Sequence, residues 1–141
     1  MADTIAFRNP ADDVIRGILS QPRTIAVVGC SPDSARDSHR VAQLLIEKGH
    51  VVIPVNPRAR EILGRRCYPS LHAIPGAVEM VDIFRRAEDA GAVVDEAIAV
   101  GAEIVWMQLG VIDLAAAARA RSAGLTVIMD RCPAIEYRQL F

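Results

Sequence analysis

The stretch that most constrains the fold is an apolar run, residues 25–28, that ends in Gly29. The run is continuous rather than alternating in hydrophobicity, which is typical of a parallel strand covered on both faces. A polar turn follows, and Asp37 or Ser38 is expected to cap the next helix. In such a strand–turn–helix unit, backbone N–H groups and the helix N-terminus can hold a phosphate. The stretch therefore predicts an α/β domain with an anion site.

The rest of the chain repeats this alternation of strands and helices with short connections. Further strands are predicted over residues 50–55, 80–84, 103–109 and 125–129, with helices over residues 11–19, 38–48, 92–100 and 113–122 and an irregular tail from residue 130. This pattern predicts a single doubly wound, mainly parallel sheet, Rossmann-like, with helices on both faces. We expect the strand order 3-2-1-4-5, one domain over residues 1–141 and a loose arm over residues 1–10.

Composition narrows the class of protein. The chain has 141 residues, of which 52% are hydrophobic, and this is enough for one covered core. A net charge of −1 disfavours general nucleic-acid binding, which needs a basic face. No apolar run is long enough to span a membrane, and the acidic N-terminus is unlike a secretory signal, so we expect a cytoplasmic protein. Three cysteines without a CxxC pair indicate neither a disulfide framework nor a zinc site.

The first loop departs from the dinucleotide-binding fingerprint. Gly-x-Gly-x-x-Gly requires glycines where this chain has Ser31 and Ser34. The serine hydroxyls, including that of Ser38, can still donate to phosphate, and Arg36 and Arg40 can face its oxygens. An ordinary strand-to-helix turn that holds no ligand is the alternative.

The end of the second strand indicates which phosphate ligand is favoured. NAD-binding domains place an acidic residue here for the ribose hydroxyls, but this chain has the neutral Asn56. Arg58 and Arg60 add positive charge, which favours a ligand with a phosphate near its adenosine ribose, such as NADP or coenzyme A. Pro54 and Pro57 stiffen the backbone beside the site.

The remaining strand ends carry further candidates. Phe84 and Arg85 lie at the end of the third strand, and Gln108 lies near the end of the fourth, where it needs a hydrogen-bond partner. Cys30 and Cys132 are both expected at the ligand edge, where a thiol can sense redox state or form a mixed disulfide, or can simply be a small buried residue. No catalytic triad, pair of carboxylates or metal-ligand cluster can be assigned, so binding is favoured over catalysis.

Six motifs occur in order between residues 15 and 140: Gly29-x-Ser31 with Ser38, Pro54-Val55-Asn56-Pro57, Tyr68-Pro69-Ser70-Leu71, Val81-Asp82-Ile83-Phe84-Arg85, Val105-Trp106-Met107-Gln108-Leu109-Gly110 and Met129-Asp130-Arg131-Cys132. Together they resemble the stand-alone CoA-binding domain proteins, which are similar to the CoA-binding domain of the succinyl-CoA synthetase α subunit. The resemblance implies coenzyme A at the carboxyl edge of the sheet, with residues 29–38 on its phosphates and residues 55–58 on its adenosine side. The synthetases carry a phosphorylated histidine on a further domain. This chain ends at Phe141, so thioester synthesis by the chain alone is not expected.

The leading interpretation is non-catalytic binding of coenzyme A or an acyl-CoA, as a carrier, sensor or partner subunit. One alternative is an NADP-dependent oxidoreductase, or a CoA-handling enzyme that uses Cys132. Another is an interaction module that forms a homodimer, or binds an unidentified protein, through residues 59–78 or through the tail residues Ile135, Tyr137, Leu140 and Phe141. The predicted ligand-binding residues are Gly29, Cys30, Ser31, Pro32, Ser34, Arg36, Ser38, Pro54, Val55, Asn56, Pro57, Arg58, Phe84, Arg85, Gln108 and Gly110.

Overall fold

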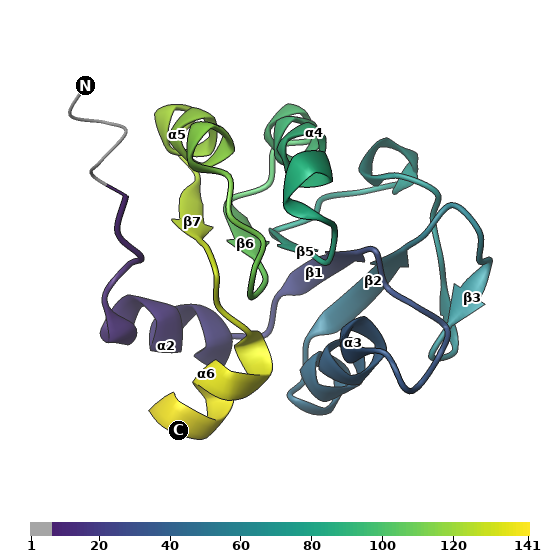
Figure 1. Ribbon diagram of the computed structural model, residues 1–141. Coiled ribbons are helices and arrows are strands. Elements are labelled where there is room, and N and C mark those ends of the chain that lie inside the picture. Colours follow the sequence, from purple (N-terminus) through teal and green to yellow (C-terminus); the bar gives the residue numbers. More distant parts are fainter. Residues whose placement is uncertain (1–6) are drawn as a thin grey trace.

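A five-stranded parallel sheet forms the centre of the computed structural model, which describes residues 7–141 (Figure 1). Its strands are β1 (Thr24–Val28), β2 (Val51–Val55), β5 (Met80–Ile83), β6 (Ile104–Met107) and β7 (Thr126–Ile128). Helices α4 (Ala87–Ala99) and α5 (Leu114–Ser122) cover one face, and α2 (Asp12–Ser20), α3 (Asp37–Glu47) and α6 (Pro133–Leu140) cover the other. The predicted doubly wound, Rossmann-like fold is confirmed. Within the described residues, no helix has the length and apolar character needed to cross a membrane.

The predicted strand order is wrong in one placement. The observed order is β2-β1-β5-β6-β7, so the third strand in the chain, β5, pairs with β1 rather than with the far side of β2. The chain crosses from β1 to β2 on one side and returns to place β5 on the other. The winding therefore reverses at the gap between β1 and β5, and ligands bind beside such a reversal in doubly wound sheets.

Pro54 explains why β2 lies at the edge of the sheet. A proline has no N–H to donate, so within sheets it is confined to edge strands, where no ladder bond is lost. The backbone of Pro54 faces outward, and its carbonyl accepts a bond of 3.1 Å from the amide of Tyr68, which lies along that edge. A second β-strand on that side would have required the N–H that Pro54 lacks.

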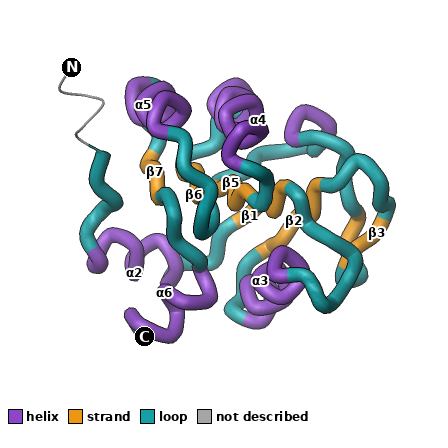
Figure 2. Tube along the Cα trace, viewed as in Figure 1, coloured by secondary structure: helices purple, strands orange, loops and turns teal. Residues whose placement is uncertain are grey.

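Two helices differ from the sequence expectation, and the irregular region contains a small hairpin (Figure 2). Helix α4 begins at Ala87 rather than after Gly91, because Glu88 and Asp89 in its first turn suit the positive end of the helix dipole. The tail after residue 130 forms α6, with a proline in its first turn, where the missing N–H costs nothing. The hairpin consists of β3 (Glu61–Ile62) and β4 (Arg65–Arg66), and the short 3-10 turn η1 (Leu71–Ala73) follows it.

A buried hydrogen-bond chain fixes α6 to the start of β2. The backbone N–H of Arg23 donates to Nδ1 of His50 (3.1 Å), so Nε2 of the neutral ring carries the proton. That proton is donated to the hydroxyl of Tyr137 (2.7 Å), which in turn donates to the carbonyl of Leu19 (2.8 Å). Tyr137 is therefore buried within its own chain and does not provide the exposed tail contact expected for a homodimer.

The segment before α2 is attached to the sheet rather than free. Residues 7–10 form no helix or strand, but the side chain of Asn9 pairs with both backbone groups of Met129, at 2.8 and 3.0 Å. The guanidinium of Arg121 lies over the ring of Phe7, 4.2 Å from its centroid. The rest of the predicted arm, residues 1–6, lies outside the described part of the chain.

Gly29 allows β1 and β5 to approach each other closely at their carboxyl ends. Its φ is +88°, and a Cβ at this position would lie 2.1 Å from the carbonyl oxygen of Phe84. The amide of Phe84 also donates to the carbonyl of Val28 at 2.8 Å. A side chain at position 29 would therefore both strain the backbone and push the two strand ends apart.

We expect Gly29→Ala to lower the free energy of unfolding by about 3 kcal/mol, because backbone strain and a steric clash act together. Gly49→Ala is the matched control: Gly49 also has a positive φ, +94°, but its added Cβ would meet no atom within 4 Å. We expect a loss of about 1 kcal/mol there, from backbone strain alone. Denaturant unfolding followed by circular dichroism measures both values. Equal losses in the two variants would contradict the close approach.

The His50 chain predicts acid sensitivity. Burial lowers the pKa of His50 from its ordinary value of 6.5, and the positive charge of Arg23 lowers it further, against a weaker raising effect of Glu79. The resulting stability is complete above pH 6.5 and is lost as the pH falls toward the lowered pKa. We expect His50→Gln, which can keep one donor and one acceptor, to flatten the loss of unfolding free energy between pH 7 and pH 5. Parallel acid slopes for the variant and the wild type would refute this role.

Candidate functional site

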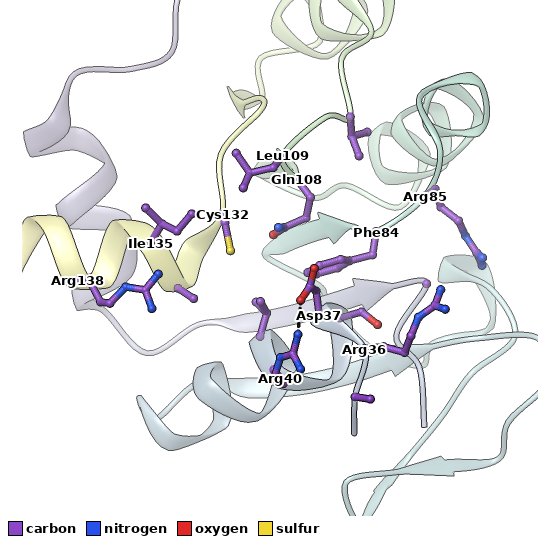
Figure 3. A pocket seen from close by; sticks show the side chains of 16 residues that line it. Arg36, Asp37, Arg40, Phe84, Arg85, Gln108, Leu109, Cys132, Ile135 and Arg138 are labelled. Atoms are coloured by element: carbon purple, nitrogen blue, oxygen red, sulfur yellow. Dashed lines mark hydrogen bonds and ion pairs between the residues drawn. The ribbon is translucent and has the colours of Figure 1, made fainter. Parts of the chain in front are cut away.

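A cavity of about 880 Å³ opens at the carboxyl ends of β1, β5 and β6 (Figure 3). The turn after β1, the first turns of α3, the residues after β5 and β6, and one side of α6 line it. This position coincides with the reversal in winding between β1 and β5, so the corrected strand order accounts for where the cavity lies.

The N-terminus of α3 faces this cavity. Ala35, Arg36, Asp37 and Ser38 all line it, and no side chain caps the helix, whose N-cap position is occupied by Arg36. The sequence expectation of an Asp37 or Ser38 cap is therefore wrong. Because the first N–H groups of a helix have no partner within the helix, they are free to bind an anion here.

The loop before α3 is held by its own polar groups. The hydroxyl of Ser38 accepts from the amide of Ser31 (3.0 Å), and the hydroxyl of Ser31 accepts from the amide of Asp33 (3.0 Å). Asp33 in turn accepts from the amide of Ala35 (2.9 Å), and a ring nitrogen of His39 pairs with the carbonyl of Ser31 (2.9 Å). These bonds fix the loop's shape before any ligand binds.

Positive charge predominates around the cavity. Arg36, Arg40, Arg85 and Arg138 line it, against the single carboxylate of Asp37, which pairs with Arg40 at 2.5 Å. Guanidinium groups bind phosphate oxygens through paired hydrogen bonds. The cavity is therefore suited to a ligand that carries more than one negative charge.

Phe84 and Gln108 lie in the middle of the cavity, between Arg36 and Arg85 on one side and Cys132 on the other (Figure 3). Gln108 is only 6% exposed, and its Oε1 is buried without a hydrogen-bond partner in the described structure. Because an unpaired buried polar atom is costly, a ligand donor at this point would stabilise the site.

Asn56 joins the loops that follow β1 and β2. Its side-chain amide donates to the carbonyl of Cys30 (2.9 Å), and its Oδ1 accepts from the amide of Arg58 (2.8 Å). An aspartate could not make the first of these bonds, because a carboxylate has no proton to donate. The structure therefore explains an asparagine at position 56 through its bond to Cys30, independently of the ligand preference inferred from the sequence.

Asp82 is a fully buried carboxyl group on β5, in register between Val27 of β1 and Trp106 of β6. Neither of its oxygens has a hydrogen-bond partner in the described structure. Burial raises the pKa of Asp82 well above its ordinary value of 3.8, so the fold favours the neutral form of this carboxyl group. The sequence motif contained this residue, but its strand position indicated only an ordinary buried site.

The two cysteines predicted at this edge differ in access. Cys30 is fully buried, and burial, with smaller contributions from Cys67 and Asp82, raises its pKa to about 12. It is therefore a thiol at neutral pH and a poor nucleophile. Cys132 is partly exposed and lines the cavity beside Ile135, at the start of α6.

The structure brings some of the predicted residues together and leaves others apart. The predicted residues that line the cavity are Gly29, Arg36, Ser38, Phe84, Arg85 and Gln108. Those outside its lining are Cys30, Ser31, Pro32, Ser34, Pro54, Val55, Asn56, Pro57, Arg58 and Gly110. The second group lies mostly in the loop after β1 and the segment after β2, whose side chains shape the backbone around the cavity.

The wall formed by α6 was missed at the sequence level. Ala134, Ile135 and Arg138 line the cavity, yet an irregular tail was expected there. A signal was present: Pro133 is favoured in the first turn of a helix, and Glu136 one turn on suits the helix dipole. The segment is short and lies far in sequence from the loop it faces, so local patterns did not connect the two.

Comparison with known proteins identifies the family. Residues 23–138 match the model of a family described as the CoA binding domain. The chain belongs to this CoA-binding domain family. It is 38% identical to the uncharacterised protein YneT of Bacillus subtilis over 126 residues, 89% of this chain and 93% of YneT. A hypothetical protein from Pyrococcus horikoshii superposes with a TM-score of 0.90 at 39% identity, over 95% of this chain and 96% of that one.

The family also extends to domains of larger enzymes. An ADP-forming acetate–CoA ligase of Archaeoglobus fulgidus is 36% identical over 78 residues, which is 55% of this chain but 11% of the ligase. An acetyl-coenzyme A synthetase of Ca. Korarchaeum cryptofilum matches with a TM-score of 0.69 at 28% identity, over 82% of this chain and 28% of the synthetase. This chain therefore corresponds to one part of those enzymes.

Asp82 predicts an unusual dependence of stability on pH. Above pH 3.8 the unfolded chain releases this proton while the folded chain keeps it, so the group costs more stability as the pH rises toward its raised pKa. We expect the unfolding free energy of Asp82→Asn, relative to the wild type, to increase as the pH rises above 4.5 and to level off once the pH passes the raised pKa. Urea titrations at several pH values measure this difference. A constant or decreasing difference would show that the carboxyl is charged in the fold.

Proposed function

We propose that this chain binds coenzyme A or an acyl-CoA in the cavity at the carboxyl edge of the sheet. The observation that carries the proposal is the arginine-lined cavity at the uncapped N-terminus of α3, in a chain that belongs to the CoA-binding domain family. Coenzyme A combines a polyanionic nucleotide with an uncharged arm that ends in a thiol. A site for it needs cationic groups at one end and apolar and amide-pairing groups at the other.

The lining of the cavity has this division. Arg36 and Arg85 lie on one side with the α3 N-terminus, where the phosphates are favoured. Leu109, Ile135 and Cys132 lie on the other side and suit the uncharged arm, although the guanidinium of Arg138 lies on that side as well. Between them lies Gln108, whose Oε1 is unpaired and buried in the described structure; a turn of its carboxamide toward the cavity would let this oxygen accept from an amide N–H of that arm.

The proposed role is binding without catalysis, as a carrier, a sensor or a partner subunit. The region matched covers only 28% of the related synthetase, so that enzyme is several times longer than this domain. In the described residues, the ring of His39 is engaged by the loop backbone and that of His50 by the α6 contact, so neither ring faces the cavity as a free base. The cavity residues provide donors for a ligand and a fixed shape.

Calorimetric titration with coenzyme A, 3′-dephospho-coenzyme A and NADP tests the proposal in protein freed of co-purified ligand. We expect coenzyme A to bind most tightly, and Arg36→Ala to weaken its binding about tenfold through the loss of a charge-assisted contact. Arg119→Ala is the control, since it removes the same charge from α5 on the opposite face and should leave binding unchanged. Absence of coenzyme A binding at millimolar concentration, or tighter binding of NADP, would overturn the proposal.

A further inference from the structure

A second cavity, of about 380 Å³, adjoins the first beyond Cys132. Leu109, Cys132 and Ile135 line both cavities, so these side chains form the boundary between them. The other lining residues of the second cavity are Asp12, Arg131, Glu136 and Gln139. The space beyond the boundary is thus bordered mainly by polar and charged groups, unlike the boundary itself.

One part of the wall of this second cavity, Arg131 and Glu136, is fixed in place. Glu136 is only 3% exposed, and its carboxylate pairs with Arg131 at 3.0 Å. The backbone of Arg131 is held in turn, because its carbonyl accepts from the indole N–H of Trp106 at 2.9 Å. A ligand entering this space therefore meets one preformed ion pair, that of Arg131 and Glu136.

The orientation of the proposed ligand brings its reactive end to this boundary. If the phosphates of coenzyme A lie at Arg36 and the α3 N-terminus, its uncharged arm extends past Gln108 toward Cys132. The thiol then lies beside the shared side chains. An acyl group carried on that sulfur would project across the boundary into the second cavity.

The chemistry of the second cavity selects among acyl groups. A long alkyl chain would cover charged side chains without pairing them, which costs desolvation free energy. An acyl group that ends in a carboxylate would face the like charges of Asp12 and Glu136. Arg131 would not offset this repulsion, because it is already paired with Glu136. A hydroxyl both donates and accepts, so it can pair with the amide of Gln139 or with a carboxylate.

We propose that the second cavity is an acyl-binding site that selects short, hydroxyl-bearing acyl groups on coenzyme A. This inference rests on the proposed function and adds to it the class of thioester that the protein holds. Cys132, Leu109 and Ile135 form the neck through which the acyl group passes.

Calorimetric titration of the full chain with coenzyme A, butyryl-CoA, 3-hydroxybutyryl-CoA and palmitoyl-CoA tests the site. We expect 3-hydroxybutyryl-CoA to bind about tenfold more tightly than coenzyme A, as one or two new hydrogen bonds would give, and more tightly than butyryl-CoA. Gln139→Trp fills the second cavity from an exposed position, so it should abolish this preference while coenzyme A binds within about twofold of the wild type. Gln43→Trp, at an exposed position of α3 outside both cavities, is the control and should keep the preference.

The outcomes separate this inference from the proposed function. Equal affinity for coenzyme A and 3-hydroxybutyryl-CoA, or a preference that survives Gln139→Trp, would overturn the acyl site and leave coenzyme A binding intact. Tighter binding of butyryl-CoA or palmitoyl-CoA would overturn the hydroxyl selectivity. Failure of coenzyme A and of every thioester to bind would overturn both.

Discussion

The close approach of β1 and β5 at Gly29 is the contact on which the rest of the site depends. The carbonyl of Phe84 occupies the space where any other residue at position 29 would place its Cβ. Because the two strand ends meet there, the turn before α3 and the residues after β5 face each other across one cavity. A wider separation would move the α3 N-terminus away from Arg85 and divide the cationic surface into two weaker parts.

The C-terminal helix closes the other side, and its position depends on a contact far from the cavity. Tyr137 joins α6 to His50 and to the carbonyl of Leu19, while Ala134, Ile135 and Arg138 of the same helix line the cavity. Lys48 adds a cation–π contact, with its ammonium 5.1 Å from the centre of the Tyr137 ring. His50 does not line the cavity itself, but it helps to hold the helix that does.

Local patterns in the sequence were sufficient for the strands and for the general location of the site. Apolar runs marked each parallel strand, although Asp82 interrupts the run of β5, and the glycine after the first strand marked the loop at the cavity. The position of β5 was missed because the apolar pattern of a strand does not show which strands it pairs with. Pro54 offered a clue, since a proline is not accommodated in a central strand and β2 therefore had to lie at an edge of the sheet. The contribution of α6 was missed because the partners of Tyr137, Leu19 and His50, lie 118 and 87 residues away in the sequence.

The polar residues of the first loop show why motif residues and ligand-contacting residues need not be the same. The hydroxyls of Ser31 and Ser38 accept from backbone amides within the loop, and the amide of Asn56 is used between loops. These side chains reduce the conformational entropy that the loop loses when a ligand binds, so they can raise affinity without making strong contacts of their own. Discrimination between ligands then falls to groups that remain available: the arginines, the buried oxygen of Gln108 and the wall formed by α6. Under the proposed function, the motif at residues 29–38 would supply the shape of the phosphate site. The choice among phosphate ligands would then depend on the arginines and on the side chains that follow β5 and β6 or belong to α6, which local sequence patterns connect least well to that loop.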